Sequence, residues 1–181
     1  SQKVKDYYKE KGVNKINTDS YYKDHSKLSF YERSQINFDH PDSIDFELLI
    51  EHIKSLIKNK SIREPVYSYK SHKRLKKNKL LKIKKIIILE GLHIFCNAEL
   101  INLIDFGLFL NLDSSTRLNR RIKRDINERG RTKQEVINRF NEMCEPMYKK
   151  FIYPSRTKAN VVMNSNQKSI NEIINLINEF I

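Results

Sequence analysis

Short apolar runs alternate along the chain with stretches in which apolar residues recur every three or four positions. Runs of the first kind predict short strands at 13–17, 86–89, 106–111 and 160–163, with 86–89 buried on both faces. Stretches of the second kind predict helices at 1–11, 42–59, 117–126, 132–140 and 169–181. Two further strands, 65–69 and 80–83, are expected to pair as a hairpin across a basic turn. Strands separated by helices indicate an α/β fold with a parallel sheet flanked by helices.

The length and apolar content fit one domain. The 181 residues are 39% hydrophobic, which is enough to bury a core without disulfides or a structural metal. We expect a single domain over 1–181, with a hairpin appendage at 62–85 and an arginine-rich lid region at 117–140. The longest unbroken apolar run, Ile86 to Leu89, is far shorter than the roughly 20 residues that cross a bilayer. We therefore expect no membrane partner.

The charge is strongly positive and unevenly placed. The formal net charge is +13, from 35 Lys and Arg against 22 Asp and Glu, which favours anionic partners or phosphorylated ligands. Residues 70–85 carry nine basic residues and no acidic one, and residues 117–133 carry eight basic residues against two acidic ones. An overall Lys-, Asn- and Ile-rich composition explains the excess equally well. RNA binding through the two segments is therefore an alternative function, and a solvated lysine turn at 70–85 is the better interpretation.

The two cysteines, Cys96 and Cys144, exclude both a disulfide scaffold and a four-cysteine zinc site. Low cysteine usage of this kind is typical of a reducing compartment, and a cytoplasmic location is expected.

Acidic residues follow two of the predicted strands. Asp19 comes after the strand at 13–17, and Glu90 comes directly after the strand at 86–89. Ligands of parallel sheets bind beyond the carboxyl ends of the strands, so both side chains are expected at one edge. Singly, Asp19 is typical of a turn residue and Glu90 of a strand-end cap. With the arginines of 117–131, these two carboxylates suit phosphoryl transfer. That reaction needs a base, acidic ligands for Mg²⁺ and positive charge around the transferred group.

Five stretches, in their order and spacing, resemble the uridine–cytidine kinase family. They are TDSYY (18–22), NFDHPDSIDF (37–46), PVYSYKSHKR (65–74), IILEG (87–91) and RRIKRDINERGR (120–131). The resemblance covers nearly the whole chain and implies a P-loop NTPase-like fold. It implies transfer of the γ-phosphate of ATP, or of GTP, to the 5′-hydroxyl of uridine or cytidine, with Mg²⁺. It also implies a homo-oligomer for the full-length protein.

The resemblance further implies a role for each matching residue. Asp19 matches the general base, Asp19 and Glu90 match carboxylates near the magnesium, and Asp39 matches the residue that holds the ribose hydroxyls. Residues around the nucleoside are matched by Tyr22, Tyr67, Tyr69, His72, Arg121 and Arg131. Residues of the lid over the triphosphate are matched by Arg124, Arg129 and Arg131. Without the family, His72 is as typical of an exposed turn as of a binding residue. Tyr67 and Tyr69 also fit a hairpin strand whose side chains alternate between its two faces.

The chain departs from the family in one major respect. The motif GxxxxGK[ST], whose amides and lysine cradle phosphates, does not occur, and the four glycines are isolated. We therefore expect an N-terminally truncated form of a kinase that lacks the central first strand of its sheet. The two halves of the sheet are expected to close up with strain or to stay poorly packed, and ATP binding is expected to be weak or absent. A non-catalytic remnant that assembles with a full-length kinase is the corresponding alternative.

Smaller departures affect single contacts. Arg139 stands where the family usually carries a glutamine near the substrate, and Asn160 and Ser165–Asn166 replace family residues near the adenine end. These positions leave one nucleoside contact and the adenine pocket undefined.

Overall fold

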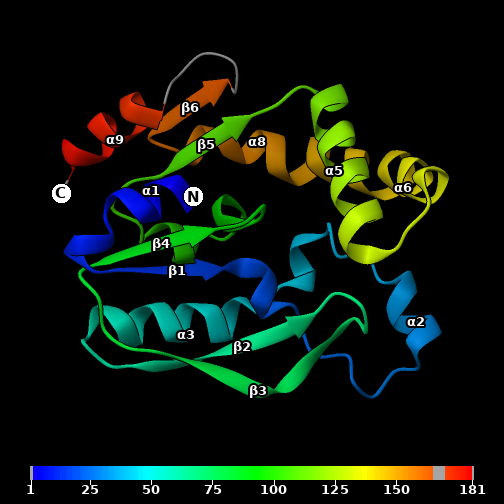
Figure 1. Cartoon of the computed structure of the whole chain (residues 1–181), viewed down its shortest axis with the longest axis horizontal. Helices are drawn as coiled ribbons and strands as arrows, with labels where there is room; N and C mark the ends of the chain where they lie inside the picture. Colours follow the sequence, from blue (N-terminus) through cyan, green and yellow to red (C-terminus); the bar gives the residue numbers. More distant parts are fainter. Residues whose placement is uncertain (1, 165–169, 181) are drawn as a thin grey trace.

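The computed structural model describes residues 2–164 and 170–180 and shows an α/β arrangement of strands flanked by helices (Figure 1). Among these residues the strands form two parallel pairs, β1–β4 and β5–β6, and one antiparallel pair, β2–β3. The strands are β1 (Val13–Asn17), β2 (Ile62–Ser68), β3 (Lys73–Leu81), β4 (Ile86–Glu90), β5 (Leu108–Asn111) and β6 (Val161–Asn164). The predicted α/β class with parallel strands is confirmed.

The helices cover these pairs and connect them. The α-helices are α1 (Gln2–Tyr7), α2 (Phe30–Gln35), α3 (Phe46–Ile57), α4 (Ala98–Ile101), α5 (Ser114–Arg129), α6 (Lys133–Arg139), α7 (Glu145–Met147), α8 (Tyr153–Ser155) and α9 (Ile170–Asn178). Two π-helical segments, η5 (Phe140–Cys144) and η6 (Tyr148–Ile152), join α6, α7 and α8 into one helical run. The short 3₁₀ turns are η1 (Lys9–Lys11), η2 (Thr18–Tyr21), η3 (Pro41–Ser43), η4 (Ile94–Cys96) and η7 (Arg156–Lys158). None of the described helices is both long and apolar enough to cross a bilayer.

The parallel pair β1–β4 positions the strand ends on which the functional prediction depends. Its register places Asn17 of β1 beside Glu90 of β4, so the two strands end together. The prediction that β4 is buried on both faces is wrong, because every residue of β4 is only half-buried. Within the described residues β4 pairs with β1 alone, which leaves its other edge without a neighbouring strand.

The antiparallel hairpin is longer and tighter than predicted. Ile62 pairs with Leu81 and Ser68 pairs with Lys73, so the turn is confined to 69–72. The expected strand at 80–83 and the long basic turn are therefore wrong, and four of the eight lysines of 70–85 lie in β3. An edge strand tolerates lysines because their charged ends remain in water. His72 completes the turn with a φ of +50°, in the left-handed region.

Local capping explains where the helices differ from the prediction. Helix α3 begins at Phe46, not at Asp42, because η3 forms a separate turn and the Asp45 side chain accepts a hydrogen bond from the Leu48 amide at 3.1 Å. Helix α2 was not predicted, although Ser29 and Glu32 form a complete capping box at its start. The first residue of the helix predicted at 169–181, Ser169, lies outside the described residues.

The apolar side chains form two cores rather than one. The larger lies around α3, β1 and β2 and includes Ile16, Tyr21, Leu49, Ile53 and Leu56. The smaller contains Ile94, Phe95, Phe109 and Ile152, and Leu89 of β4 packs against both. Within the described residues β4 and β5 are not paired with each other, so the two halves do not close up into one sheet.

Candidate active site

A cavity of about 500 Å³ lies beyond the carboxyl ends of β1 and β4. The end of α5 approaches the tip of the β2–β3 hairpin beside it (Figure 1). The cavity brings together all the residues that the sequence analysis selected, which are Asp19, Tyr22, Asp39, Tyr67, Tyr69, His72, Glu90, Arg121, Arg124, Arg129 and Arg131. Residues up to 112 positions apart in the chain thus line one space, with Asp19 and Arg131 at the extremes.

The two strand ends fix the carboxylates of Asp19 and Glu90. After β1 the chain turns into η2, where the Asn17 side chain accepts a hydrogen bond from the Asp19 amide at 2.9 Å. After β4 comes Gly91, where a Cβ atom would lie 1.7 Å from Oγ1 of Thr18. A side chain at position 91 would collide with Thr18, so the glycine lets the end of β4 pack against the start of η2, and Glu90 and Asp19 line the same cavity from these two segments.

Asp19 is a stronger base than an ordinary aspartate. Burial raises its pKa, and the negative charge of Asp39 adds to this effect. The Tyr69 hydroxyl donates a hydrogen bond to Oδ2 of Asp19 at 3.2 Å, and Arg129 and Arg124 also favour the ionised form, but they compensate only in part. A carboxylate with a raised pKa takes up a proton more readily, which is the property a general base needs.

The residues at the strand ends fit a magnesium ion that is bound together with phosphate groups. Glu90 Oε1 is 2.9 Å from Nζ of Lys15, so part of its charge is already paired. No cluster of three or more metal-ligating side chains occurs in the described part of the chain. Mg²⁺ in nucleotide sites takes one or two carboxylates and completes its shell with water and phosphate oxygens. Asp19 and Glu90 supply that number of carboxylates.

The pKa of Asp39 is shifted in the opposite direction from that of Asp19. Its two oxygens accept hydrogen bonds from the Arg121 guanidinium at 2.7 and 3.3 Å, and the Cys144 thiol donates to Oδ2 at 3.2 Å. Burial of Asp39 opposes ionisation, but Arg121 and the hydrogen bonds outweigh it and hold its pKa below the usual range. Asp39 is therefore a fixed carboxylate that is ionised across the physiological pH range.

Aromatic rings form one wall of the cavity. The ring centroid of Tyr22 is 5.1 Å from those of Phe38 and Tyr67, and Tyr67 is 5.7 Å from Tyr69. His72 stacks on Phe38 with the centroids 5.4 Å apart and the planes 13° apart. Burial lowers the pKa of His72, and nearby arginines lower it further. The imidazole is therefore neutral at pH 7, with one nitrogen that donates and one that accepts.

The arginines of α5 are held by an acidic residue that the sequence analysis did not select. Asp125 is buried, and its carboxylate is 2.8 Å from Arg124 and 3.4 Å from Arg129. The Arg129 guanidinium also lies 4.5 Å from the centroid of the Tyr69 ring. Gly130 ends the helix with a φ of +67°, and its amide and that of Arg131 donate to the Asp125 carbonyl. Asp125 thus holds Arg124 and Arg129 through its carboxylate and Arg131 through its carbonyl.

Two further arginines brace the cavity: Arg33, which the sequence analysis did not select, and Arg139, which it placed near the substrate. Buried Arg33 donates to the carbonyls of Ser71 and Leu28, which ties α2 to the turn that carries His72. Arg139 lines the cavity and donates to the carbonyls of Ser34 and Ile36 at 3.1 and 2.9 Å. The Arg139 guanidinium is therefore largely occupied in holding α2. The capping box of α2 was the sequence signal that could have located this segment.

Comparisons with known proteins agree with this geometry. The "Uridine kinase" of Clostridium novyi (strain NT) is 40% identical over 163 residues, covering 90% of this chain and 78% of the relative. The "Uridine kinase" of Halalkalibacterium halodurans is 43% identical over 156 residues, covering 86% and 74%. The solved phosphoribulokinase from Rhodobacter spheroides shares the fold, with a TM-score of 0.64 at 14% identity over 90% of this chain and 63% of that one. A model of the family described as "Phosphoribulokinase / Uridine kinase family" matches residues 2–170, and the chain belongs to this kinase family.

Proposed function

We propose that the cavity binds a pyrimidine ribonucleoside, uridine or cytidine, and that its 5′-hydroxyl is the acceptor of a phosphoryl group. The observation that carries this proposal is the placement of an ionised carboxylate, Asp39, in the same cavity as a carboxylate of raised pKa, Asp19. The first suits a group that holds hydroxyls, and the second suits a group that removes a proton. The relatives named uridine kinase support the same substrate class.

Asp39 is proposed to hold the two ribose hydroxyls. Arg121 and Cys144 already donate hydrogen bonds to the Asp39 carboxylate and fix its orientation. These three hydrogen bonds use three of the about four acceptor positions of an ionised carboxylate, so one position on Oδ1 remains for a ribose hydroxyl, and the second hydroxyl is proposed to displace the weak thiol donor of Cys144. Each hydrogen bond to a charged partner contributes about 1.5–3 kcal/mol. A 2′-deoxynucleoside loses one of these bonds, so ribose is selected.

The aromatic wall and His72 are proposed to bind the base. Tyr22, Tyr67 and Tyr69 present flat surfaces against which a planar base packs, and the neutral imidazole of His72 can donate or accept at the base edge. Arg131 lines the same side of the cavity. Because one imidazole can satisfy either a carbonyl or an amino group, this geometry accommodates both uridine and cytidine.

Asp19 is proposed to accept the proton of the 5′-hydroxyl as that oxygen attacks the terminal phosphate of the donor nucleotide. Arg124 and Arg129, held by Asp125, place positive charge in the cavity where the transferred group carries negative charge. A donor such as ATP supplies the phosphoryl group, and its Mg²⁺ neutralises charge on the phosphates. Asp19 and Glu90 are the carboxylates proposed to bind this Mg²⁺ together with water and phosphate oxygens.

Binding of the donor is proposed to be weak for these 181 residues alone, because no GxxxxGK[ST] loop is present among them. Such a loop provides the amides and the lysine that bind the β- and γ-phosphates. Titration calorimetry with Mg·ATP should give no heat, or an affinity weaker than micromolar. A micromolar dissociation constant would contradict this part of the proposal.

The activity itself is tested by fusing a strand and a GxxxxGK[ST] loop to Ser1. The joined chain is expected to transfer phosphate from ATP to uridine, and Asp19→Asn should abolish the transfer. Asp42→Asn is the matched control, because Asp42 is an exposed aspartate outside the cavity. No transfer to uridine by a folded, ATP-binding chain would contradict the proposed function.

A further inference from the structure

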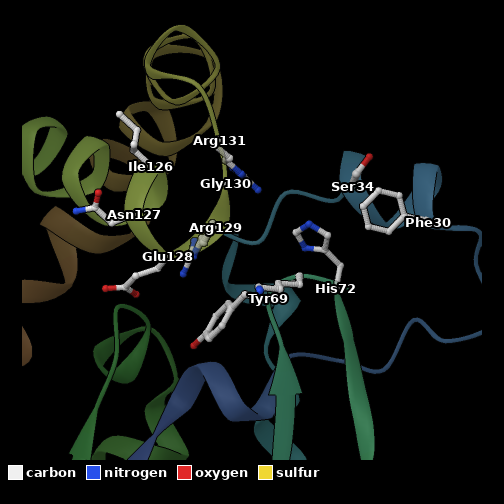
Figure 2. Close-up of a pocket in the computed structure, with 11 residues that line it drawn as sticks. Phe30, Ser34, Tyr69, His72, Ile126, Asn127, Glu128, Arg129, Gly130 and Arg131 are labelled. Atoms are coloured by element: carbon white, nitrogen blue, oxygen red, sulfur yellow. The ribbon is translucent and has the colours of Figure 1, made fainter.

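A second cavity, of about 610 Å³, adjoins the first (Figure 2). It lies between α2, the turn of the β2–β3 hairpin and the end of α5. The two cavities share four lining residues, which are Tyr69, His72, Arg129 and Arg131. A ligand group that passes His72 and Arg131 from the nucleoside cavity therefore enters the second one.

The charge of the second cavity is positive. Lys70, Arg129 and Arg131 line it, against the single carboxylate of Glu128. Arg129 is partly neutralised by Asp125, whereas no ion pair of Lys70 or Arg131 occurs within the described residues. In Figure 2 Arg131 points toward His72, and the Glu128 carboxylate lies on the other side of Arg129 from that ring. The part of the cavity beside His72 thus has an excess of positive charge.

The uncharged lining residues of the cavity include aromatic and apolar side chains as well as the polar Ser34 and Asn127. The Phe30 ring is 6.0 Å from the His72 ring, centroid to centroid, and is 57% exposed. Ile126 lines the same cavity and is also exposed. Exposed apolar side chains of this kind offer contact to the methylene groups of a ligand. The cavity thus has an exposed aromatic ring beside His72, together with the cations that line it.

We propose that this second cavity receives an acidic substituent on the base of the nucleoside, so that the chain prefers pyrimidine ribonucleosides whose base carries a carboxylate on a short side chain. The inference rests on the proposed function, because it places the base edge at His72. A substituent next to that edge, at position 5 of the pyrimidine, projects past His72 into the second cavity, which Lys70 and Arg131 line. A neutral substituent of the same size lacks the attraction to these cations.

Calorimetric titration of the 181-residue chain with three nucleosides tests the proposal. They are uridine, 5-carboxymethyluridine and the methyl ester of 5-carboxymethyluridine, which has nearly the same shape without the charge. The acid is expected to bind about three to ten times more tightly than the ester, as is typical of partly exposed ion pairs. Raising the salt from about 0.05 to 0.5 M should reduce this ratio toward one, because salt screens exposed charges.

The Lys70→Met variant removes one cation that lines only the second cavity. It should lower the preference for the acid over the ester at least twofold and leave uridine binding unchanged. Lys76→Met is the matched control, since Lys76 is an exposed lysine of the same hairpin that lines neither cavity. This control should keep the full preference.

The outcomes separate the inference from the proposed function. If uridine binds but the acid binds no more tightly than the ester, the second cavity does not recognise a charged substituent and the inference is wrong. If Lys70→Met and Lys76→Met have equal effects, the preference comes from the overall positive charge of the chain and the inference is again wrong. If none of the three nucleosides binds, the proposed function itself fails.

Discussion

Two aspartates in one cavity differ in pKa because their neighbours differ. Asp19 is surrounded by groups that only partly offset its burial, so its pKa is raised. Asp39 receives a bidentate guanidinium and a thiol, so its pKa is lowered despite burial. Pairs of acidic groups whose environments push their pKa values apart are typical of sites that divide base and binding roles. The two roles follow from these contacts rather than from the residue type.

Asp19→Asn is expected to raise the thermal stability of the chain at pH 7. The folded pKa of Asp19 lies above its unfolded value, so its ionised form costs stability once the pH exceeds the unfolded pKa. Asparagine removes this charge with little change of shape. The gain in melting temperature should shrink as the pH falls through the raised pKa, where Asp19 becomes protonated.

Melting curves of the Asp19→Asn and Asp42→Asn variants between pH 4 and 8 provide the measurement. The exposed control should show no such pH-dependent gain. A destabilised Asp19→Asn variant at pH 7 would mean that hydrogen bonds of Asp19 outweigh the cost of its burial.

At the scale of elements, the end of α5 depends on one buried carboxylate. Asp125 pairs with Arg124 and Arg129, and its carbonyl receives the amides that close the helix. Asp125→Asn should therefore loosen residues 124–131 and make them more accessible to trypsin, which cleaves after arginine. The rate of cleavage after Arg129 and Arg131 should rise several-fold, measured by mass spectrometry of the early fragments.

Glu128→Gln is the matched control for this experiment, because Glu128 is exposed on the same helix end and forms no ion pair with these arginines within the described residues. Its cleavage rate should equal that of the original chain. Equal rates for all three proteins would show that Asp125 does not hold the end of α5 in place.

The close approach of β4 to η2 makes Gly91 intolerant of a side chain. A Cβ at this position would lie 1.7 Å from Oγ1 and 2.8 Å from Cβ of Thr18, and Thr18 is buried. Gly91→Ala is therefore expected to lower the free energy of unfolding by about 2 kcal/mol or more, as overpacking of a tight contact does. It should also displace Asp19, which follows Thr18 directly.

Gly130→Ala is the comparison, because no atom lies within 4 Å of its added Cβ and only its φ of +67° is unfavourable. We expect it to cost about 1 kcal/mol. Urea unfolding of both variants measures the difference. A smaller loss for Gly91→Ala than for Gly130→Ala would contradict the proposed contact between β4 and η2.

At the scale of the whole molecule, the sequence predicted local structure and chemistry better than it predicted boundaries. The strand at 13–17 follows from local periodicity and appears as predicted, and the helix predicted from Thr132 appears as α6 with Thr132 as its N-cap. The hairpin register failed because lysines in β3 hide the strand pattern, and α3 began late because a proline turn precedes it. The register of a hairpin and the first residue of a helix depend on packing with the rest of the fold, which the local sequence pattern does not contain.

The candidate site shows the same division. Residues that follow predicted strands, such as Asp19 and Glu90, were found because the edge of a parallel sheet collects ligands. Asp125 and Cys144 were missed because they lie 14 residues or more along the chain from the nearest strand end. Their roles follow only from the side chains they contact in the fold. Pairings across the fold, such as Asp39 with Arg121, leave no periodic signal in a single sequence.

The central claim is that Asp39, fixed by Arg121, selects a ribonucleoside in this cavity. Calorimetric titration of the chain with uridine and with 2′-deoxyuridine tests it most directly. We expect uridine to bind at least tenfold more tightly, in line with the loss of one hydrogen bond of about 1.5–3 kcal/mol to a charged acceptor. Asp39→Ala should remove this difference. Equal affinity of the original chain for both nucleosides would contradict the claim.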